Sequence, residues 1–375
     1  MDVTFLKPVT DHPGPCATVC ADVTHTTENA DTELGLRVRA LTGQLADQGA
    51  PEAVVEAVRS RLTEGDEDGE AGTFRGRAVI VGPGAEVLLD VPLADAPRTE
   101  TAEWSPLPDA VSVLRALPGR IPHVVVVADR VGADITVATA PGLPVEEKSI
   151  DGETHLMRKV QVGGWAHRRF QHNAENVWIH NVQQVIDEID TVVDRTGARF
   201  VLVAGDVRAR QIFTDRATPK IQAVLVDMDE GGRAEGADRS VIDQRVEELV
   251  AENDAAEQAK VIEQIEAASA HGLAVTGTAQ VVEALRKAQV ETLVLADEPS
   301  GEQLVIGPSP LEIGVGAEDM AALGVTDAVQ VPAERALLRA AVGSDAAVVV
   351  VPRAAMPDGV PSAAVLRYTD ASTPG

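Results

Sequence analysis

The segment between His155 and His172 combines a flexible backbone, a large aromatic side chain and a local excess of positive charge. Gly163 and Gly164 precede Trp165, and four basic residues surround this triplet without any Asp or Glu. The basic residues are Arg158, Lys159, Arg168 and Arg169. Adjacent glycines give the backbone unusual freedom, and the arginine fork donates several hydrogen bonds to phosphate. We therefore interpret this basic segment as a loop that can enter a narrow, phosphate-rich crevice.

Two simpler interpretations of the basic segment stay open. A run of charges is commonly a solvated face, and a Gly-Gly pair can form a tight turn whose Trp165 packs on the next helix. The whole chain carries a formal net charge of −27. Nucleic-acid binders gain affinity from clustered Lys and Arg, so this balance argues against a free-standing DNA or RNA binder. Attraction to phosphate is expected only from the basic segment.

The elements on either side of the basic segment must hold it in place. Before it, an apolar run at Ile121–Asp129 and an alternating run at Asp134–Ala140 predict a β-hairpin. After it, apolar residues recur at helical spacing from Phe170 to about Arg195 and predict a long amphipathic helix. Two further apolar runs, Phe200–Ala204 and Gln222–Val226, are typical of strands inside a covered sheet. The basic segment is therefore expected inside an α/β domain.

The length of 375 residues exceeds the size at which one hydrophobic core stops growing, so several domains are expected. The first part predicts a strand, two helices and two short strands, and it ends in a proline-rich linker. These elements are expected at Ala17–Thr24, Asp31–Gln48, Pro51–Leu62, Ala78–Val81 and Glu86–Val91. After a long helix at about Val241–Ser269, short strands and helices alternate to the end of the chain.

We therefore predict an α/β protein of three domains. An N-terminal α/β domain is expected over residues 1–119, a middle domain with the basic segment over 120–255, and a C-terminal α/β/α sandwich over 256–375.

Familiar catalytic signatures are absent from the sequence. It has no Walker loop, no dinucleotide fingerprint after a strand, no His-Glu-x-x-His pair and no Gly-x-Ser-x-Gly elbow. Asp129 and Asp206 follow predicted strands, where an α/β site can form but where Asp also commonly caps a turn or a helix. His155, His167 and His172 have no carboxylate or Cys at ligand spacing. We expect no metal, no cofactor and no catalytic residue.

Cys16 and Cys20 are the only cysteines, and they fall four residues apart in the first predicted strand. At the usual rise they lie about 13 Å from each other on one face, too far for a disulfide. Both are expected to be small buried side chains. No apolar run approaches the roughly 20 residues of a membrane span, and the first residues lack the features of a signal peptide. We expect a cytoplasmic protein with no membrane contact.

The basic segment resembles the Gly-Gly-Gln loop of the archaeal and eukaryotic peptide-chain release factors. Against that family's Gly-Gly-Gln-Ser-Ala-Leu-Arg-Phe stretch, Gly163, Gly164, Arg169 and Phe170 match. Trp165 stands where the family has its catalytic Gln. Gln offers both a hydrogen-bond donor and an acceptor to a water molecule, whereas indole offers one donor and a face on which a base can stack. The exchange favours occupancy of a site over hydrolysis.

The resemblance extends over about residues 121–368. Residues 272–295 look like the start of the family's C-terminal domain, and residues 363–368 are similar to its closing Gly-Gly-Ile-Leu-Arg-Tyr strand. Within the family the chain resembles the bacterial branch, which includes Pelota-like factors and Balon-like ribosome hibernation factors. Residues 1–119 depart from the pattern, because they lack the Asn-Ile-Lys-Ser loop that reads stop codons.

The resemblance implies a ribonuclease-H-like middle domain and a factor that occupies the A site of idle ribosomes. The loop would reach the peptidyl-transferase region and contact 23S rRNA, elongation factor Tu would be a candidate co-partner, and the chain would act as a monomer without binding DNA. The implied rRNA contacts are Gly163, Gly164, Trp165, His167, Arg168 and Arg169 in the loop, with phosphate contacts from Arg158 and Lys159.

Two alternatives remain at this point. The first is a ribosome rescue enzyme that releases a stalled peptide or cuts tRNA, for which His155, His167 and Asp206 are the candidate bases. The second is a stress-related scaffold that has left the ribosome.

Overall fold

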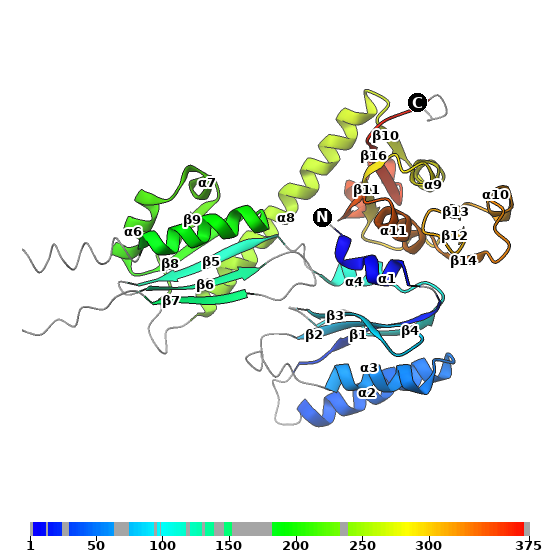
Figure 1. Cartoon of the computed structure of the whole chain (residues 1–375), viewed down its shortest axis with the longest axis horizontal. Coiled ribbons are helices and arrows are strands. Elements are labelled where there is room, and N and C mark those ends of the chain that lie inside the picture. The colour runs from blue at the N-terminus through cyan, green and yellow to red at the C-terminus, as the bar shows by residue number, and fades with distance from the viewer. Residues whose placement is uncertain are drawn as a thin grey trace, which may run out of the picture. The chain divides into compact units, whose positions relative to one another are not determined.

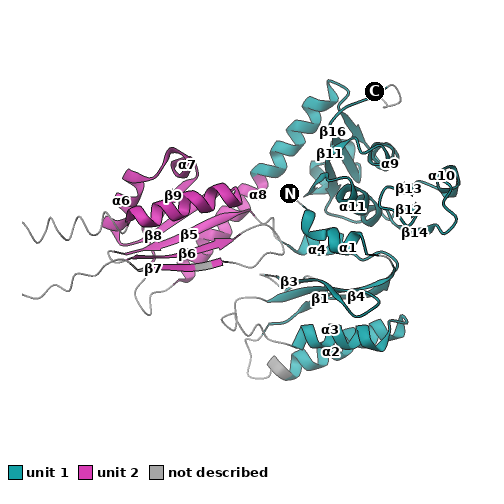
Figure 2. Cartoon of the chain, in the orientation of Figure 1, with its two compact units in different colours: residues 1–118, 256–375 teal, residues 119–255 magenta. Residues whose placement is uncertain are grey.

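The computed structural model describes residues 3–12, 14–24, 30–63, 75–93, 96–97, 99–117, 121–129, 132–138, 146–151, 182–232 and 239–370. They form two compact units: residues 1–118 together with 256–375 make up unit 1, and residues 119–255 make up unit 2 (Figure 2). In the described part of the chain, no helix is long and apolar enough to span a membrane.

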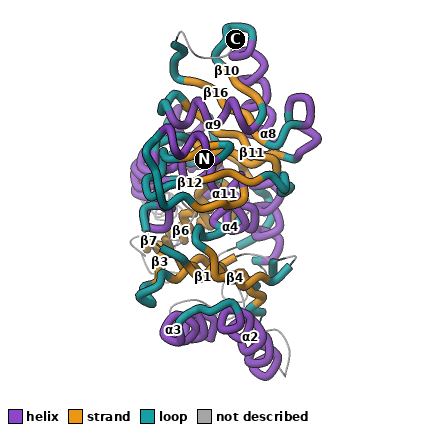
Figure 3. Tube along the Cα trace, turned by 90° about the vertical axis from the view of Figure 1, so that its right-hand side faces the viewer, coloured by secondary structure: helices purple, strands orange, loops and turns teal. Residues whose placement is uncertain are grey.

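The first part of unit 1 is a four-stranded antiparallel sheet of order β3-β2-β1-β4 (Figure 1). Its strands are β1 (Cys16–Asp22), β2 (Gly76–Val81), β3 (Val87–Leu93) and β4 (Thr101–Ser105). Helices α2 (Ala30–Asp47) and α3 (Glu52–Thr63) lie together against one face (Figure 3). On the other side are η1 (Thr4–Leu6), α1 (Lys7–Thr10) and α4 (Ala110–Ala116).

Both faces of β1 are covered, and its side chains divide between two clusters. Ala17 and Val19 pack with α2 and α3, whereas Cys16 and Cys20 belong to the cluster on the opposite face. Both cysteines are free and buried, as the sequence predicts. Burial raises the pKa of the Cys16 thiol to about 12 and that of the Cys20 thiol to about 11. Each thiol is therefore a neutral core side chain at neutral pH.

The second part of unit 1 is an α/β/α sandwich, as predicted. Its sheet has the order β10-β16-β11-β15, and only β15 runs parallel to β11 among the paired strands. The strands are β10 (Ala274–Thr276), β11 (Val290–Ala296), β15 (Ala347–Val351) and β16 (Ser362–Leu366). Leu293 and Leu295 face α9 (Thr278–Arg286) and α11 (Ala333–Gly343), while Val294 faces the end of α8 (Ser240–Ser269). The short helices η2 (Arg353–Ala355) and η3 (Pro357–Gly359) precede β16.

A small substructure is inserted between β11 and α11. Three short antiparallel strands pair in the order β13-β12-β14, and α10 packs on them. These elements are β12 (Gln303–Ile306), β13 (Ile313–Gly314), α10 (Ala317–Ala322) and β14 (Val329–Pro332). The sequence did not predict them, because each is short and carries little periodicity.

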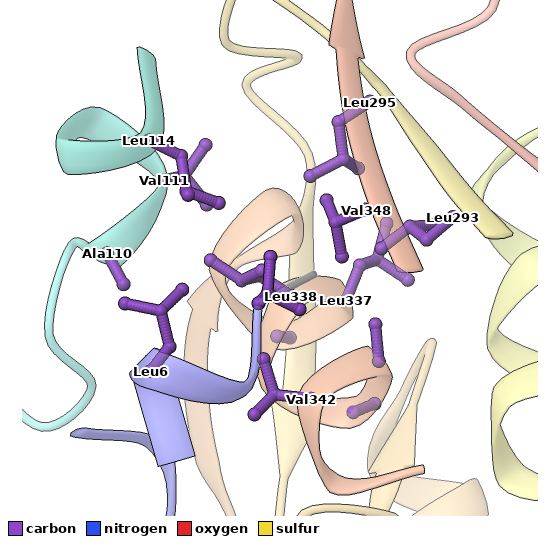
Figure 4. Packing of buried hydrophobic residues seen from close by; sticks show 14 of the residues in the cluster. Leu6, Ala110, Val111, Leu114, Leu293, Leu295, Leu337, Leu338, Val342 and Val348 are labelled. Atoms are coloured by element: carbon purple, nitrogen blue, oxygen red, sulfur yellow. The ribbon is translucent and has the colours of Figure 1, made fainter. Parts of the chain in front are cut away.

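The two parts of unit 1 share one hydrophobic cluster. Figure 4 shows Leu6 and Leu114 from the first part gathered with Leu337 and Leu338 of α11. Arginines reinforce the contact: Arg335 binds both carboxylate oxygens of Glu103, at 2.8 and 2.7 Å. The predicted division into three domains stays a prediction. The predicted N-terminal domain and the predicted C-terminal domain share this hydrophobic cluster.

A second arginine of α11 also joins the two parts of unit 1. The guanidinium of Arg339 donates to the carbonyls of Gly307, Pro308 and Ser309, and at 3.4 Å to that of Thr10. Burial lowers the pKa of Arg339 from its ordinary value, with Glu312 and Asp11 acting in the opposite direction. The charge of Arg339 is compensated mainly by the dipoles of these carbonyl groups. The same hydrogen bonds connect Thr10, near the start of the chain, to the loop after β12.

Unit 2 is built on a five-stranded sheet of order β7-β6-β5-β8-β9. Its strands are β5 (His123–Ala128), β6 (Gly132–Ala138), β7 (Glu146–Asp151), β8 (Phe200–Gly205) and β9 (Leu225–Asp227). β6 is antiparallel to β5 and β7, whereas β8 is parallel to β5 and β9. Counted within the unit this is the order 3-2-1-4-5 of ribonuclease-H-like folds, so the predicted fold of this region is confirmed.

Helices cover both faces of the unit 2 sheet. The helix over residues 182–196, α6 (Val207–Arg216) and α7 (Pro219–Gln222) pack on one face, and the first half of α8 packs on the other. The predicted strand at Gln222–Val226 was placed too early and judged too buried. Thr218 and Pro219 begin α7 there, and β9 is only half covered.

Candidate functional site

The residues that the sequence singles out fall in one stretch between β7 and the helix over residues 182–196. All lie within residues 152–181, outside the described residues. They are Arg158, Lys159, Gly163, Gly164, Trp165, His167, Arg168 and Arg169, and His155 and His172 belong to the same stretch. The structure describes the two elements on either side of this stretch, which are β7 before it and the helix over residues 182–196 after it.

The element after the stretch is held by apolar contacts. Ile186 and Ile189 of the helix over residues 182–196 are fully buried against the sheet, in the same cluster as Ile135 and Val201. Removing one such side chain costs about 2–5 kcal/mol, because a cavity remains. The predicted amphipathic helix is therefore confirmed over these residues, and its position is set by the core.

The element before the stretch, β7, lies at one edge of the sheet and was missed by the sequence analysis. Its pairing with β6 is continuous from Asp151 to Glu146. Lys148 forms an ion pair with Glu188 at 2.8 Å, and Glu146 accepts from Arg195 at 2.5 Å. Exposed pairs of this kind contribute about 0–1 kcal/mol each, so backbone pairing is the main anchor. β7 was not predicted because Pro144 precedes it and its first three residues are charged.

An open groove lies between β7 and the helix over residues 182–196. It is lined by Glu146, Lys148, Glu188, Thr191, Val192 and Arg195. Its two cations are those paired with its two carboxylates, so the lining is close to neutral. The groove therefore offers no net attraction to an anion or a cation.

The two aspartates that follow β5 and β8 act as caps. The Asp206 carboxylate accepts hydrogen bonds from the amides of Arg208 and Ala209, at 3.0 and 3.2 Å, and begins α6. Asp129 accepts from the amide of Gly132 at 2.8 Å and closes the β5–β6 turn. These contacts match the structural interpretation of both residues, because an N-cap carboxylate stabilises the free amides of a helix start.

The position before Asp206 requires glycine. Gly205 has a φ of +110°, and a Cβ at this position would lie 2.0 Å from the carbonyl oxygen of Ala128. Parallel β5 and β8 approach each other here, and the amide of Asp206 donates to that same carbonyl. The local geometry at this strand end is explained by packing and capping.

A buried arginine that the sequence analysis missed fixes the last strand of the sheet. The Arg210 side chain on α6 is 3% exposed, and it binds Asp227 at 2.5 Å and Asp229 at 2.6 Å. Burial disfavours the charge, but hydrogen bonds to Asp229 and Asp227 outweigh it and raise the pKa of Arg210 above its ordinary value. The burial of Arg210 could have been recognised in the sequence from its position beside Ala209 and Phe213, which form the apolar face of α6.

Several cations in the described part of unit 2 are neutralised by neighbouring carboxylates. The pairs are Lys148–Glu188, Arg195–Glu146, Arg210–Asp227, Lys220–Asp194, Arg239–Asp134 and Arg245–Glu248. Paired charges produce little long-range field, since the two signs cancel within a Debye length. Among the residues that the structure describes, no three His, Cys, Asp or Glu side chains are grouped so as to hold a metal ion.

Residues 122–271 match the family model described as bacterial archaeo-eukaryotic release factor family 2. The resemblance predicted from the basic segment is thereby confirmed for this part of the chain. Two relatives from Mycobacterium tuberculosis span nearly the whole chain. The uncharacterized proteins Rv2629 (strain ATCC 25618 / H37Rv) and MT2704 (strain CDC 1551 / Oshkosh) are each 27% identical over 360 residues, covering 95% of this chain and 94% of their own.

Solved structures of similar chains include the archaeal translation termination factor aRF1. It is 15% identical to this chain, the match covers 97% of this chain and 96% of aRF1, and the TM-score is 0.26. Archaeoglobus fulgidus Pelota has 16% identity, coverage of 98% and 92%, and a TM-score of 0.36. The model of ribosome-bound archaeal Pelota and ABCE1 has 14% identity, coverage of 98% and 94%, and a TM-score of 0.41. TM-scores this low do not establish a common arrangement of the whole chain.

Proposed function

Because residues 122–271 match the bacterial archaeo-eukaryotic release factor model, we propose that this chain is a ribosome-binding factor that occupies the A site of idle ribosomes. In this proposal the Gly163-Gly164-Trp165 loop reaches the peptidyl-transferase region and keeps the ribosome inactive but intact. The contacts with 23S rRNA come from this triplet with His167, Arg168 and Arg169, and those with phosphate from Arg158 and Lys159. The factor acts as a monomer in the cytoplasm, with elongation factor Tu as its candidate co-partner.

The observation that carries the proposal is the combination of the family match with Trp165 in place of the catalytic Gln. A release factor works on the ribosome, and the exchange removes the acceptor that would orient a hydrolytic water. An indole can instead stack on a base, which contributes about 1–3 kcal/mol per base. These two facts favour a factor that binds without breaking a bond.

The charges of unit 2 support the assignment of the phosphate contacts. Cations such as Lys148, Arg210 and Lys220 already have carboxylate partners within the unit. Four basic residues without any acidic one stand between His155 and His172, and phosphate affinity comes from such excess charge. The basic segment is therefore the best-suited part of this unit for rRNA.

The rescue alternative needs a group that can act as a general base. Of its three candidates, Asp206 is engaged as the cap of α6, and His155 and His167 lie outside the described residues. No observation on the described residues favours this alternative over occupancy. A direct test of peptide release separates the two functions.

Co-sedimentation with 70S ribosomes from stationary-phase cells tests the proposal. We expect wild type to sediment at low salt and to dissociate as salt rises, because phosphate contacts release counterions. Arg168→Glu with Arg169→Glu should weaken binding by about 100-fold or more, with an unchanged circular-dichroism melt.

A matched control carries the same change of charge on a distant surface. Arg39→Glu with Arg59→Glu alters two exposed residues of α2 and α3 and should sediment like wild type. If the loop variant binds as tightly as this control, the basic segment is not the rRNA contact. If wild type does not sediment at any salt concentration, the proposed function itself is wrong.

A further inference from the structure

The sheet in the first part of unit 1 is open, so it has two edge strands, β3 and β4 (Figure 1). The free side of an edge strand presents a row of backbone amides and carbonyls that no neighbouring strand pairs with. Such a row is a template on which a strand of another chain can add, and folded proteins commonly block it. The two edges of this sheet are blocked in different ways.

The β3 edge is blocked by its own sequence. Pro92 lies in this strand opposite Arg77 of β2, and a proline has no amide hydrogen to donate to a further strand. The pairing of β3 with β2 also shifts register between Ile80 and Val81, and a regular added strand does not match such an irregularity. Strand addition at β3 is therefore disfavoured by the strand itself.

The β4 edge has no comparable protection in its sequence. It contains no proline, no glycine and no lysine, and its residues are Thr101, Ala102, Glu103, Trp104 and Ser105. Its one charged side chain, Glu103, is engaged by α11, where Arg335 binds both carboxylate oxygens. The sequence of β4 is therefore suited to accept an added strand.

The side chain of Gln48 pairs with the free side of β4. Its amide nitrogen donates to the carbonyl of Ala102 at 3.0 Å, and its amide oxygen accepts from the backbone amide of Trp104 at 2.7 Å. These two backbone groups flank Glu103. In a parallel sheet a single residue of the neighbouring strand makes the same two bonds, to the residues before and after its counterpart. Gln48 therefore takes the place of one residue of a fifth strand.

The end of α2 fixes the backbone of Gln48. The next residue, Gly49, has a φ of +87°, which ends the helix. The amide of Gly49 donates to the carbonyl of Ala46 and that of Ala50 to the carbonyl of Leu45, each at 3.0 Å. These two bonds define a Schellman motif, and Leu45 and Ala50 pack in the same cluster. Gln48 is thus held beside the middle of β4 by a defined helix end.

The contact is not needed to satisfy the backbone of β4. Gln48 is an exposed residue, and water can bind the same amide and carbonyl groups at a surface position. What the Gln48 side chain removes is the availability of these groups to another chain. The contact therefore has the character of a block on association.

We propose that Gln48 closes the β4 edge and that the strand it excludes is β4 of a second copy of this chain. Ala102 and Trp104 direct their amides and carbonyls to the free side. Two copies related by a twofold axis can place Ala102 of each opposite Trp104 of the other in antiparallel register, and all of these groups are then paired. Glu103 of each copy would face its counterpart, with Arg335 compensating the charge. The inference goes beyond the proposed function and does not rest on it.

Disulfide trapping in the full-length chain tests the proposal. In this register the two residues at position 103 form a pair without hydrogen bonds, in which the Cβ atoms are close enough for a disulfide. Cys16 and Cys20 are buried and do not compete. Under mild oxidation, Glu103→Cys with Gln48→Ala should give at least about 10-fold more disulfide-linked dimer than Glu103→Cys alone, because the edge is open.

Two further variants in the Glu103→Cys background serve as controls. Gln44→Ala makes the same change one turn earlier on an exposed position of α2, away from the β4 contact. Val54→Ala weakens the cluster under α2 and α3 and leaves Gln48 in place, so it reports association caused by partial unfolding. Both should give no more dimer than Glu103→Cys alone.

The proposal is overturned by equal trapping with and without Gln48, or by trapping in the Val54→Ala variant that equals that of Gln48→Ala. Sedimentation velocity of Gln48→Ala, with Glu103 retained, gives a second measurement. We expect a dimer that grows with protein concentration, whereas the wild type stays monomeric. A monomeric Gln48→Ala variant would contradict the proposal, and so would a dimer that position 103 does not trap. These measurements use no ribosomes, so their failure is distinct from failure of the proposed function.

Discussion

Unit 2 and residues 288–334 of unit 1 are both acidic, but they differ in how many of their carboxylates are paired with a cation. In unit 2, Arg210, Lys220 and Arg245 each have carboxylate partners, and the described residues of the unit hold 19 Asp or Glu against nine Lys or Arg. In residues 288–334, Glu318 and Asp327 stand exposed without a cation. The cations of unit 2 named here are already engaged by carboxylates, so under the proposed function we expect phosphate to be attracted only by the basic segment.

The contribution of an ion pair to stability depends on whether its side chains are exposed or buried. An exposed ion pair contributes about 0–1 kcal/mol, so the surface pairs of unit 2 add little to its stability. A buried cation such as Arg210 is different, because removing it leaves a cavity and two carboxylates without their partner.

The largest effect on folding is expected at Arg210. Arg210→Ala should lower the free energy of unfolding by about 2–3 kcal/mol, because the buried side chain leaves a cavity and no longer joins α6 to the end of β9, while Asp227 and Asp229 remain open to solvent. Urea unfolding followed by circular dichroism measures this change. Arg216→Ala, on an exposed position of the same helix, should cost less than about 0.5 kcal/mol. Equal effects of the two substitutions would show that the buried network does not stabilise the unit.

A smaller effect is expected from the pair between Arg335 and Glu103. A double-mutant cycle with Arg335→Met and Glu103→Gln should give a coupling energy of about 1–2 kcal/mol, since Arg335 is mostly buried but Glu103 is partly solvated. The exposed pair Arg59–Glu56 is the control, with an expected coupling below about 0.5 kcal/mol. A coupling near zero for the first pair would mean that apolar packing alone joins the two parts of unit 1.

The smallest effect at neutral pH is expected from the thiols of β1. Their folded-state pKa values, about 12 for Cys16 and about 11 for Cys20, lie above the ordinary value of 9.0. Below pH 8 both states keep the protons, so the thiols give no pH dependence. As the pH rises beyond about 9 the unfolded state loses protons first, and stability falls.

Urea midpoints between pH 8 and 9.5 test this sign. The wild type should lose about 1 kcal/mol more over this range than the double variant Cys16→Ala, Cys20→Ala, which has no thiol to titrate. The comparison uses the slope with pH, so a lower absolute stability of the variant does not affect it. Parallel pH profiles would contradict the burial of the thiols.

The sequence predicted the elements with a strong apolar pattern and missed those with a weak one. The hairpin of β5 and β6, the strand β8 and the long helix α8 were expected close to their observed bounds, because alternating or helical patterns extend over many residues. By contrast β7 is as long as β5 and β8 but is charged and lacks an apolar pattern, and the strands β12, β13 and β14 are short. They form because neighbouring strands provide pairing partners, which a local pattern does not reveal.

Only some contacts of the candidate site could be predicted from the sequence. The capping of α6 by Asp206 follows from residue type and position, and it was anticipated. The ion pairs of Arg210 join residues 17 and 19 positions apart, and only the fold brings them together. The contact of Arg335 with Glu103 spans 232 positions, so no pattern along the chain indicates it.

The measurement that tests the central claim most directly is peptide release from ribosomes that carry labelled peptidyl-tRNA in the P site. Wild type, Trp165→Ala and Trp165→Gln are compared at equal occupancy. We expect no release above background from wild type or Trp165→Ala, and binding weaker by about 1–3 kcal/mol for Trp165→Ala because the stacking contact is lost.

Trp165→Gln restores both a donor and an acceptor, so weak release should appear in that variant first. We therefore expect the wild-type protein to bind the ribosome and to release no peptide. Peptide release by wild type that disappears in Trp165→Ala would contradict it and would identify the protein as a rescue enzyme.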